Sequence, residues 1–171
     1  MILLGIDPGL NTTGYGLIDY NPHHTQFIAA GVIKNSRMMI FPDKLHHLYR
    51  ELGDIIRHYK PELVIIEETY SNRNPRTSLL LGHARGVLMV AARNLEVPVI
   101  EYASRYIKKA LTGNGGASKE QVRYMVMKLL KLVNLPPEMD ASDALAIALT
   151  HCHHMKYESL LYPDKKQRRT R

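Results

Sequence analysis

The segment ELVIIEET, residues 62–69, constrains the fold more than any other part of the chain. Its apolar residues are consecutive and do not alternate with polar ones, which is typical of a strand that is buried on both faces of its sheet. Such a strand needs a layer of structure on each side, because both of its faces must be covered. The segment therefore predicts an α/β protein with this strand near the centre of the sheet.

The residues before this segment predict three strands, over 2–7, 14–19 and 25–33. The connections between them carry the Gly, Pro and Asn residues of turns, and connections this short favour an antiparallel meander. From residue 43 to 60 the apolar spacing changes to that of an amphipathic helix.

A second helix over 77–95 leads to a fifth strand over 98–103. The alternation of strands and helices predicts that the last two strands are parallel to their neighbours through right-handed crossovers. The expected fold class is α/β, with a five-stranded mixed sheet, an antiparallel meander plus two parallel strands, flanked by helices.

The chain after the sheet predicts three further helices. The first begins at Ser104 and ends before the glycine-rich break at 113–116. Ser118, with Gln121 three residues later, has the spacing of a capping box and predicts the start of the second. The last helix begins near Asp140.

The 171 residues fit one domain, which we expect over residues 1–155, followed by a basic, disordered tail over 156–171. The net charge of +7 suggests a polyanionic partner such as nucleic acid. The single cysteine, Cys152, excludes an intramolecular disulfide and a thiolate zinc cage. We expect a cytoplasmic protein, because no segment reaches the roughly 18 apolar residues of a membrane span.

Several carboxylates occupy positions where apolar residues are expected. Asp7 ends the first strand, Glu67 and Glu68 end the central strand, and Asp140 and Asp143 lie on one face of the last helix. A buried charge is costly unless it is paired or binds a metal, and open α/β sheets place ligands at the carboxyl ends of their strands.

Clustered carboxylates suit Mg²⁺ or Mn²⁺, and two such ions can promote in-line displacement at phosphorus. Three of these residues also have a structural explanation when each is taken alone. Asp140 can be an ordinary helix N-terminal residue, Asp7 can shape a turn with Pro8 and Gly9, and Glu68 can be a solvated strand end.

Four segments together resemble the RuvC-type Holliday junction resolvases, which have a ribonuclease H-like fold. They are GIDPGLNTTGYGLI, IIEETY, SLLLGHARGV and DASDALAIALTHCH, and the similarity is colinear from residue 2 to about 154. The resemblance implies a metal-dependent endonuclease in which two Mg²⁺ ions, replaceable by Mn²⁺, are bound by Asp7, Glu67, Asp140 and Asp143. The family pattern has a neutral residue at the position of Glu68, so an auxiliary role for Glu68 stays open.

The resemblance also implies a homodimer that binds a four-way DNA junction. Such enzymes make paired, symmetric nicks that leave 5′-phosphate and 3′-hydroxyl ends, in homologous recombination and DNA repair, and they act with the RuvA and RuvB branch-migration proteins. Gly82 and Gly86 lie on the helix that forms the family's dimer contact. Their spacing indicates close packing, either against a partner chain or against the sheet.

Further residues match family positions near the DNA. Lys108 and Lys119 match lysines that contact DNA near the cut, and Lys108 can also offset charge on the reacting phosphate. Tyr70 matches an aromatic residue that stacks on an unpaired base. Arg73 and Arg76 are expected to contact phosphates from the same loop. The competing explanations are solvated lysines and a packed tyrosine.

Other functions remain to be weighed against this one. The DPGLNTTG turn resembles the phosphate loop of actin-like ATPases, but those proteins need two such domains. A nuclease of the same fold that acts on RNA, and a non-catalytic junction-binding protein, are the closer alternatives. The run of His151, Cys152, His153 and His154 has no zinc-site spacing, and protonated histidines are favoured near the carboxyl end of a helix.

Overall fold

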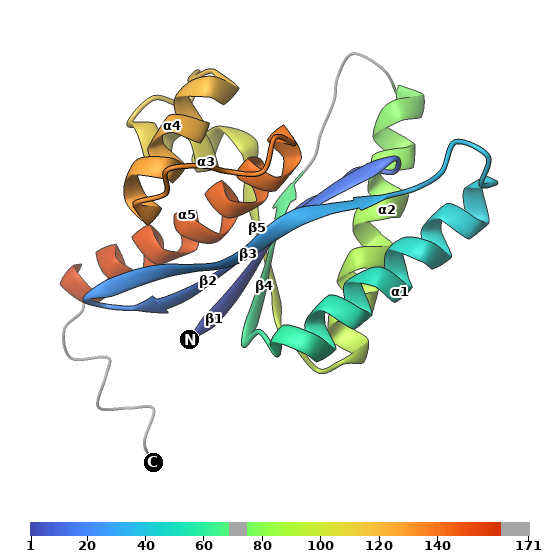
Figure 1. Ribbon diagram of the computed structural model, residues 1–171, viewed down its shortest axis with the longest axis horizontal. Helices are drawn as coiled ribbons and strands as arrows, with labels where there is room; N and C mark the ends of the chain where they lie inside the picture. Colours follow the sequence, from blue (N-terminus) through green and yellow to red (C-terminus); the bar gives the residue numbers. More distant parts are fainter. Residues whose placement is uncertain (69–74, 162–171) are drawn as a thin grey trace.

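A five-stranded mixed sheet forms the middle layer of the molecule (Figure 1). Its strands are β1 (Ile2–Asp7), β2 (Thr12–Asn21), β3 (His24–Lys34), β4 (Leu63–Glu68) and β5 (Val99–Ala103). They lie in the order β3-β2-β1-β4-β5, with β1–β2 and β2–β3 antiparallel and β1–β4 and β4–β5 parallel. The predicted fold class is therefore confirmed.

The structure is a computed structural model that describes residues 1–68 and 75–161, with side chains described to residue 157. Two helices, α1 (Phe41–Tyr59) and α2 (Pro75–Asn94), cover one face of the sheet. Three more, α3 (Ser104–Thr112), α4 (Lys119–Leu130) and α5 (Met139–Leu161), cover the other face. No helix in the described part of the chain is both long and apolar enough to cross a membrane.

Side chains alternate between the two faces of the sheet along each strand, so the core consists of two halves, one on each face. Val64 and Ile66 of β4 pack with α1 and α2, whereas Ile65 between them packs with the helices of the opposite face. All three side chains are fully buried, as the apolar run predicted for a central strand. This alternation also decides to which face the polar residues at the end of β4 belong.

The second strand is longer than predicted, since it starts at Thr12 instead of residue 14. The residues before Gly14 follow Pro and Asn, which predict a turn, but Thr12 and Thr13 pair with Lys34 and Ile33 of β3. β-branched threonines fit a pleated strand once such a partner is available.

Helix α5 lies unusually close to the sheet because glycines replace side chains beneath it. A Cβ atom at Gly5 would overlap the carbonyl oxygen of Ala144, and one at Gly16 would lie 2.7 Å from the amide nitrogen of Leu145. Gly5 and Gly16 face each other across β1 and β2. The backbone of α5 therefore lies directly against the backbone of these two strands.

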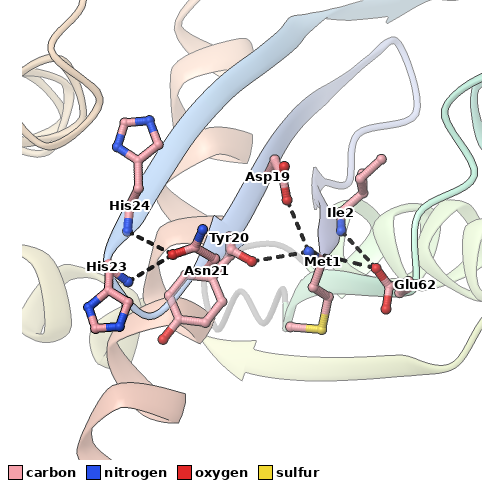
Figure 2. A network of polar contacts seen from close by, with 8 residues as sticks. All are labelled: Met1, Ile2, Asp19, Tyr20, Asn21, His23, His24 and Glu62. Carbon is pink, nitrogen blue, oxygen red and sulfur yellow. Dashed lines mark hydrogen bonds and ion pairs between the residues drawn. The ribbon is translucent and has the colours of Figure 1, made fainter.

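Figure 2 shows a polar network at the start of β1. The amino group of Met1 lies 3.0 Å from Asp19 Oδ1, 3.1 Å from the Tyr20 carbonyl oxygen and 3.8 Å from Glu62 Oε1. The amide of Ile2 donates to the same Glu62 oxygen at 3.2 Å. The network connects the start of β1 with the end of β2 and with the residue before β4.

Candidate active site

Three carboxylates from two distant segments converge at the carboxyl end of β1. Asp7 is the last residue of β1, and Asp140 and Asp143 lie in the first turns of α5. One oxygen atom from each of the three lies within 4.8 Å of the other two, and all three residues are partly buried. Three carboxylates at this separation repel one another unless a cation lies among them.

The position of Asp140 follows from the glycine beside Asp7. Gly14 of β2 pairs directly with Asp7. A Cβ atom at Gly14 would overlap the carbonyl oxygen of Asp140, so the absence of a side chain lets the start of α5 approach this pair. Asp143, three residues later, projects from the same helix face.

Glu67 lies on the wall of the same site, outside the tight group of three. It shares with Asp7 and Asp143 a cavity of about 180 Å³. Side chains alternate along β4, so Glu67 faces the same side as Ile65, whereas Glu68 faces the opposite side and is exposed. Glu68 therefore does not line this cavity.

Burial and neighbouring negative charge raise the pKa values of two of the carboxylates, Asp7 and Glu67. Burial, followed by the charges of Glu67 and Asp143, raises the pKa of Asp7 from 3.8 to about 8. Burial also raises the pKa of Glu67, although a hydrogen bond with Ser104 opposes the change. The site is thus unfavourable for negative charge until a cation enters it.

Two lysines supply positive charge at the rim. Lys119 Nζ lies 2.6 Å from Asp143 Oδ2. Burial lowers the pKa of Lys119, but the hydrogen bond to Asp143 and the nearby carboxylates outweigh this and raise it overall. Lys108 lines the cavity beside Glu67 and Ser104.

Of the three other residues that the sequence predicted for DNA contact, the structure describes Arg76. Arg76 is exposed in the first turn of α2, away from the residues that line the carboxylate cavity. Tyr70 and Arg73 lie outside the described residues.

Gly82 and Gly86 do not pack against the sheet, which was one of the two contacts that their spacing left open. A Cβ atom at either position would meet no described atom within 4 Å. Both glycines line an open groove of about 590 Å³ on the outer side of α2, together with Leu79 and Val90. These two side chains are 63% and 60% exposed, respectively.

The histidines were expected near the carboxyl end of a helix, but α5 continues to Leu161, so they lie inside it, and they have partners other than a metal. His151 Nδ1 lies 2.9 Å from the Tyr102 hydroxyl, and His153 Nδ1 lies 3.1 Å from the Ala110 carbonyl oxygen. Within the described part of the chain, the group of three or more metal-binding side chains is the carboxylate group at Asp7.

Sequence reasoning missed two contributors to the site, Ser104 and Gly14. Ser104 carried no signal, because its contact with Glu67 depends on how α3 meets β5. Gly14 and Gly16 did carry one, since glycines two apart in a strand indicate that another backbone approaches one face closely.

Comparison with known proteins gives one consistent result. Residues 3–151 match the family described as "Crossover junction endodeoxyribonuclease RuvC". A curated protein of that description from Pectobacterium atrosepticum is 44% identical over 152 residues, which cover 89% of this chain and 88% of the relative. One from Legionella pneumophila is 43% identical over 170 residues, 99% of this chain and 97% of the relative.

Solved structures agree with the sequence relatives. The Thermus thermophilus RuvC structure is 31% identical, with a TM-score of 0.83 over 92% of this chain and 96% of that one. The structure of T. thermophilus RuvC in complex with Holliday junction substrate is 29% identical, with a TM-score of 0.82 over the same shares.

Proposed function

The chain belongs to the RuvC family of crossover junction endodeoxyribonucleases, and we propose that it resolves four-way (Holliday) DNA junctions by metal-dependent hydrolysis of phosphodiester bonds. The observation that carries this proposal is the convergence of Asp7, Asp140 and Asp143 in a partly buried site. The net charge of +7 over the whole chain favours a nucleic-acid substrate.

Mg²⁺ is the proposed cofactor, with Mn²⁺ able to replace it. Asp7, Glu67, Asp140 and Asp143 would hold two ions, and their donor set fits, because carboxylate oxygens are the ligands that such hard cations prefer. Ions held by these carboxylates would supply charge stabilisation for an in-line displacement at phosphorus. The raised pKa values of Asp7 and Glu67 are consistent with a site that needs this charge.

The lysines and Ser104 have supporting roles in this proposal. Lys119, hydrogen-bonded to Asp143, and Lys108, on the cavity wall, offset charge on the phosphate that is cut. Ser104 orients the Glu67 carboxylate through its hydrogen bond. Tyr70, Arg73 and Arg76 are further proposed DNA contacts, and the cut leaves 5′-phosphate and 3′-hydroxyl ends.

The active unit is proposed to be a homodimer. The groove on the outer side of α2, lined by Leu79, Gly82, Gly86 and Val90, is the proposed contact between the two chains. A two-fold axis relates the two active sites and accounts for paired, symmetric nicks. RuvA and RuvB are the proposed partner proteins.

The test uses synthetic four-way junctions, with each strand labelled in turn, on a denaturing gel. We expect the wild-type protein with Mg²⁺ to nick two opposite strands symmetrically. Glu67→Gln should lower the rate at least about 100-fold, the upper end of what a lost supporting group costs at a metal site. Glu68→Gln, its matched control from the neighbouring position, should retain the wild-type rate.

Three results would contradict the proposal. One is nicking that is equally fast in EDTA, which would exclude the metal. Another is an equal loss of activity in the two glutamine variants, which would contradict the proposal that Glu67 acts in the site and Glu68 does not. The third is faster cleavage of a structured RNA than of the DNA junction, which would favour the related RNA nucleases.

A further inference from the structure

The segment over residues 131–138 determines where α5 begins, and therefore where Asp140 lies. It connects α4 to α5 and contains Pro136 and Pro137. Proline has no amide hydrogen and disfavours a helical conformation in the residue before it, so this segment cannot extend either helix. Its carbonyl groups need donors from elsewhere in the molecule.

Arg123 of α4 supplies those donors. Its Nη2 atom lies 2.8 Å from the carbonyl oxygen of Pro136 and 3.5 Å from that of Leu135, and its Nη1 atom lies 3.8 Å from the sulfur of Met139. The planar guanidinium group can contact these neighbours at once, whereas a lysine ammonium would act as a single point charge. Hydrogen bonds from a charged donor are stronger than neutral ones.

The contacts of Arg123 end one residue before Asp140. Asp140 is held on its other side by Gly14, whose missing side chain accommodates the Asp140 carbonyl. One helical turn before Arg123, Lys119 contacts Asp143. The first half of α4 therefore contacts the segment around the start of α5 at two points, and β2 contacts the start of α5 at Gly14.

Lys34 also contacts the segment over residues 131–138, but this contact limits the movement of the segment less than Arg123 does. Lys34 at the end of β3 pairs with Glu138 at 2.9 Å, with side chains 62% and 34% exposed. Exposed ion pairs of this kind contribute little to stability. Arg123 is partly buried and bonds to backbone, so it limits the movement of the segment more strongly.

We propose that Arg123 is a positioning residue for the metal site: it holds residues 135–139 so that Asp140 and Asp143 stay close to Asp7. The need for such a residue follows from the origin of the carboxylates, since they come from separate elements yet lie within 4.8 Å of one another and repel one another whenever they are ionised. The inference rests on the proposed metal-dependent function, because it explains how metal ligands from separate elements are kept together.

The test measures Mn²⁺ binding to the DNA-free protein by calorimetry, well below the melting temperature of each variant. Arg123→Gln should raise the Kd for Mn²⁺ by about 3- to 10-fold, somewhat less than the loss of a group that contacts a ligand directly. Arg123→Lys should have an intermediate Kd. Lys128→Gln, which removes one exposed positive charge from the same helix, should bind Mn²⁺ as the wild type does.

A second measurement follows the Mg²⁺ dependence of junction nicking. Arg123→Gln should need more Mg²⁺ for half-maximal rate, while its metal-free affinity for the junction should match that of Lys128→Gln, since both lose one charge. A lower melting temperature with unchanged Mn²⁺ affinity would show a purely structural role and overturn the inference.

If Arg123→Gln does not fold, Arg123→Lys decides: weaker Mn²⁺ binding supports the inference, and wild-type binding overturns it. Wild-type protein that binds no Mn²⁺ would overturn the proposed metal site itself, and this inference with it. That result is seen without any variant, so the two failures are distinguishable.

Discussion

Asp7 is a carboxylic acid in a place where negative charge is costly. Its pKa of about 8 results mainly from burial and from the neighbouring Glu67 and Asp143. In the absence of metal, the folded protein therefore keeps a proton on Asp7 over a pH range in which the unfolded chain has lost it. By linkage, the contribution of Asp7 to the free energy of unfolding decreases as the pH rises from about 4 to about 8.

This predicts a pH-dependent effect of Asp7→Asn on stability. In EDTA, the variant should melt at a higher temperature than the wild type at pH 8, and the difference should shrink towards pH 4.5, where the wild-type side chain is also uncharged. Thermal denaturation followed by circular dichroism across this range measures the difference. Mg²⁺ should stabilise the wild type more than the variant, and a difference independent of pH would contradict the argument.

At the level of elements, the site depends on how closely α5 approaches β1 and β2. Gly14→Ala should displace the start of α5, because the new methyl group would overlap the Asp140 carbonyl. We expect a loss of about 1 to 3 kcal/mol in the free energy of unfolding, as for other overpacked positions. The nicking rate should also fall, since Asp140 and Asp143 move with the helix.

Gly116→Ala is the matched control for this change. Its Cβ atom would meet Asn114 Oδ1 at an ordinary 3.4 Å, and its backbone is outside the left-handed region. Its melting temperature and nicking rate should stay close to those of the wild type. Equal effects of the two substitutions would mean that close approach of α5 is not what Gly14 provides.

Most elements could be predicted from the sequence because their burial patterns are local. The apolar run of β4 and the capping box at Ser118 and Gln121 both gave the right element at the right place. Parallel pairing predicted that Asp7 and Glu67, at the carboxyl ends of their strands, could converge, whereas the direct pairing of β1 with β4 is seen in the structure.

The rest of the site depends on contacts that leave no pattern in the sequence. Arg123 donates to backbone carbonyls, which any residue provides, so its partners could not be inferred from side-chain types. The choice between Glu67 and Glu68 required the exact strand register, because a shift of one residue exchanges the two faces.

At the level of the whole molecule, the sheet separates the carboxylate site from the groove on α2. The site lies on the face covered by α3, α4 and α5, whereas α2 covers the opposite face. Leu79→Glu should therefore convert a dimer into a monomer without altering the metal ligands, since it places a charge in the apolar groove.

Sedimentation velocity at one protein concentration tests this prediction. Met38→Glu, at a side chain that is 91% exposed outside the groove, should sediment as the wild type does. A monomeric wild type, or a Leu79→Glu protein that stays dimeric, would place the contact between chains elsewhere.

The hydrogen bond between Lys119 and Asp143 would couple the binding of metal to the binding of DNA. Under the proposed function, a divalent ion would compete with the ammonium group for the same carboxylate oxygen, and a phosphate of DNA would compete with the carboxylate for the ammonium group. Substrate that draws Lys119 away from Asp143 would remove a cation that competes with the metal, so it would raise the affinity of the site for the metal. By thermodynamic reciprocity, bound metal would raise the affinity for substrate by the same factor. Ion and nucleic acid would then enter cooperatively, so that the hydrolytic centre is completed chiefly where there is a strand to cut.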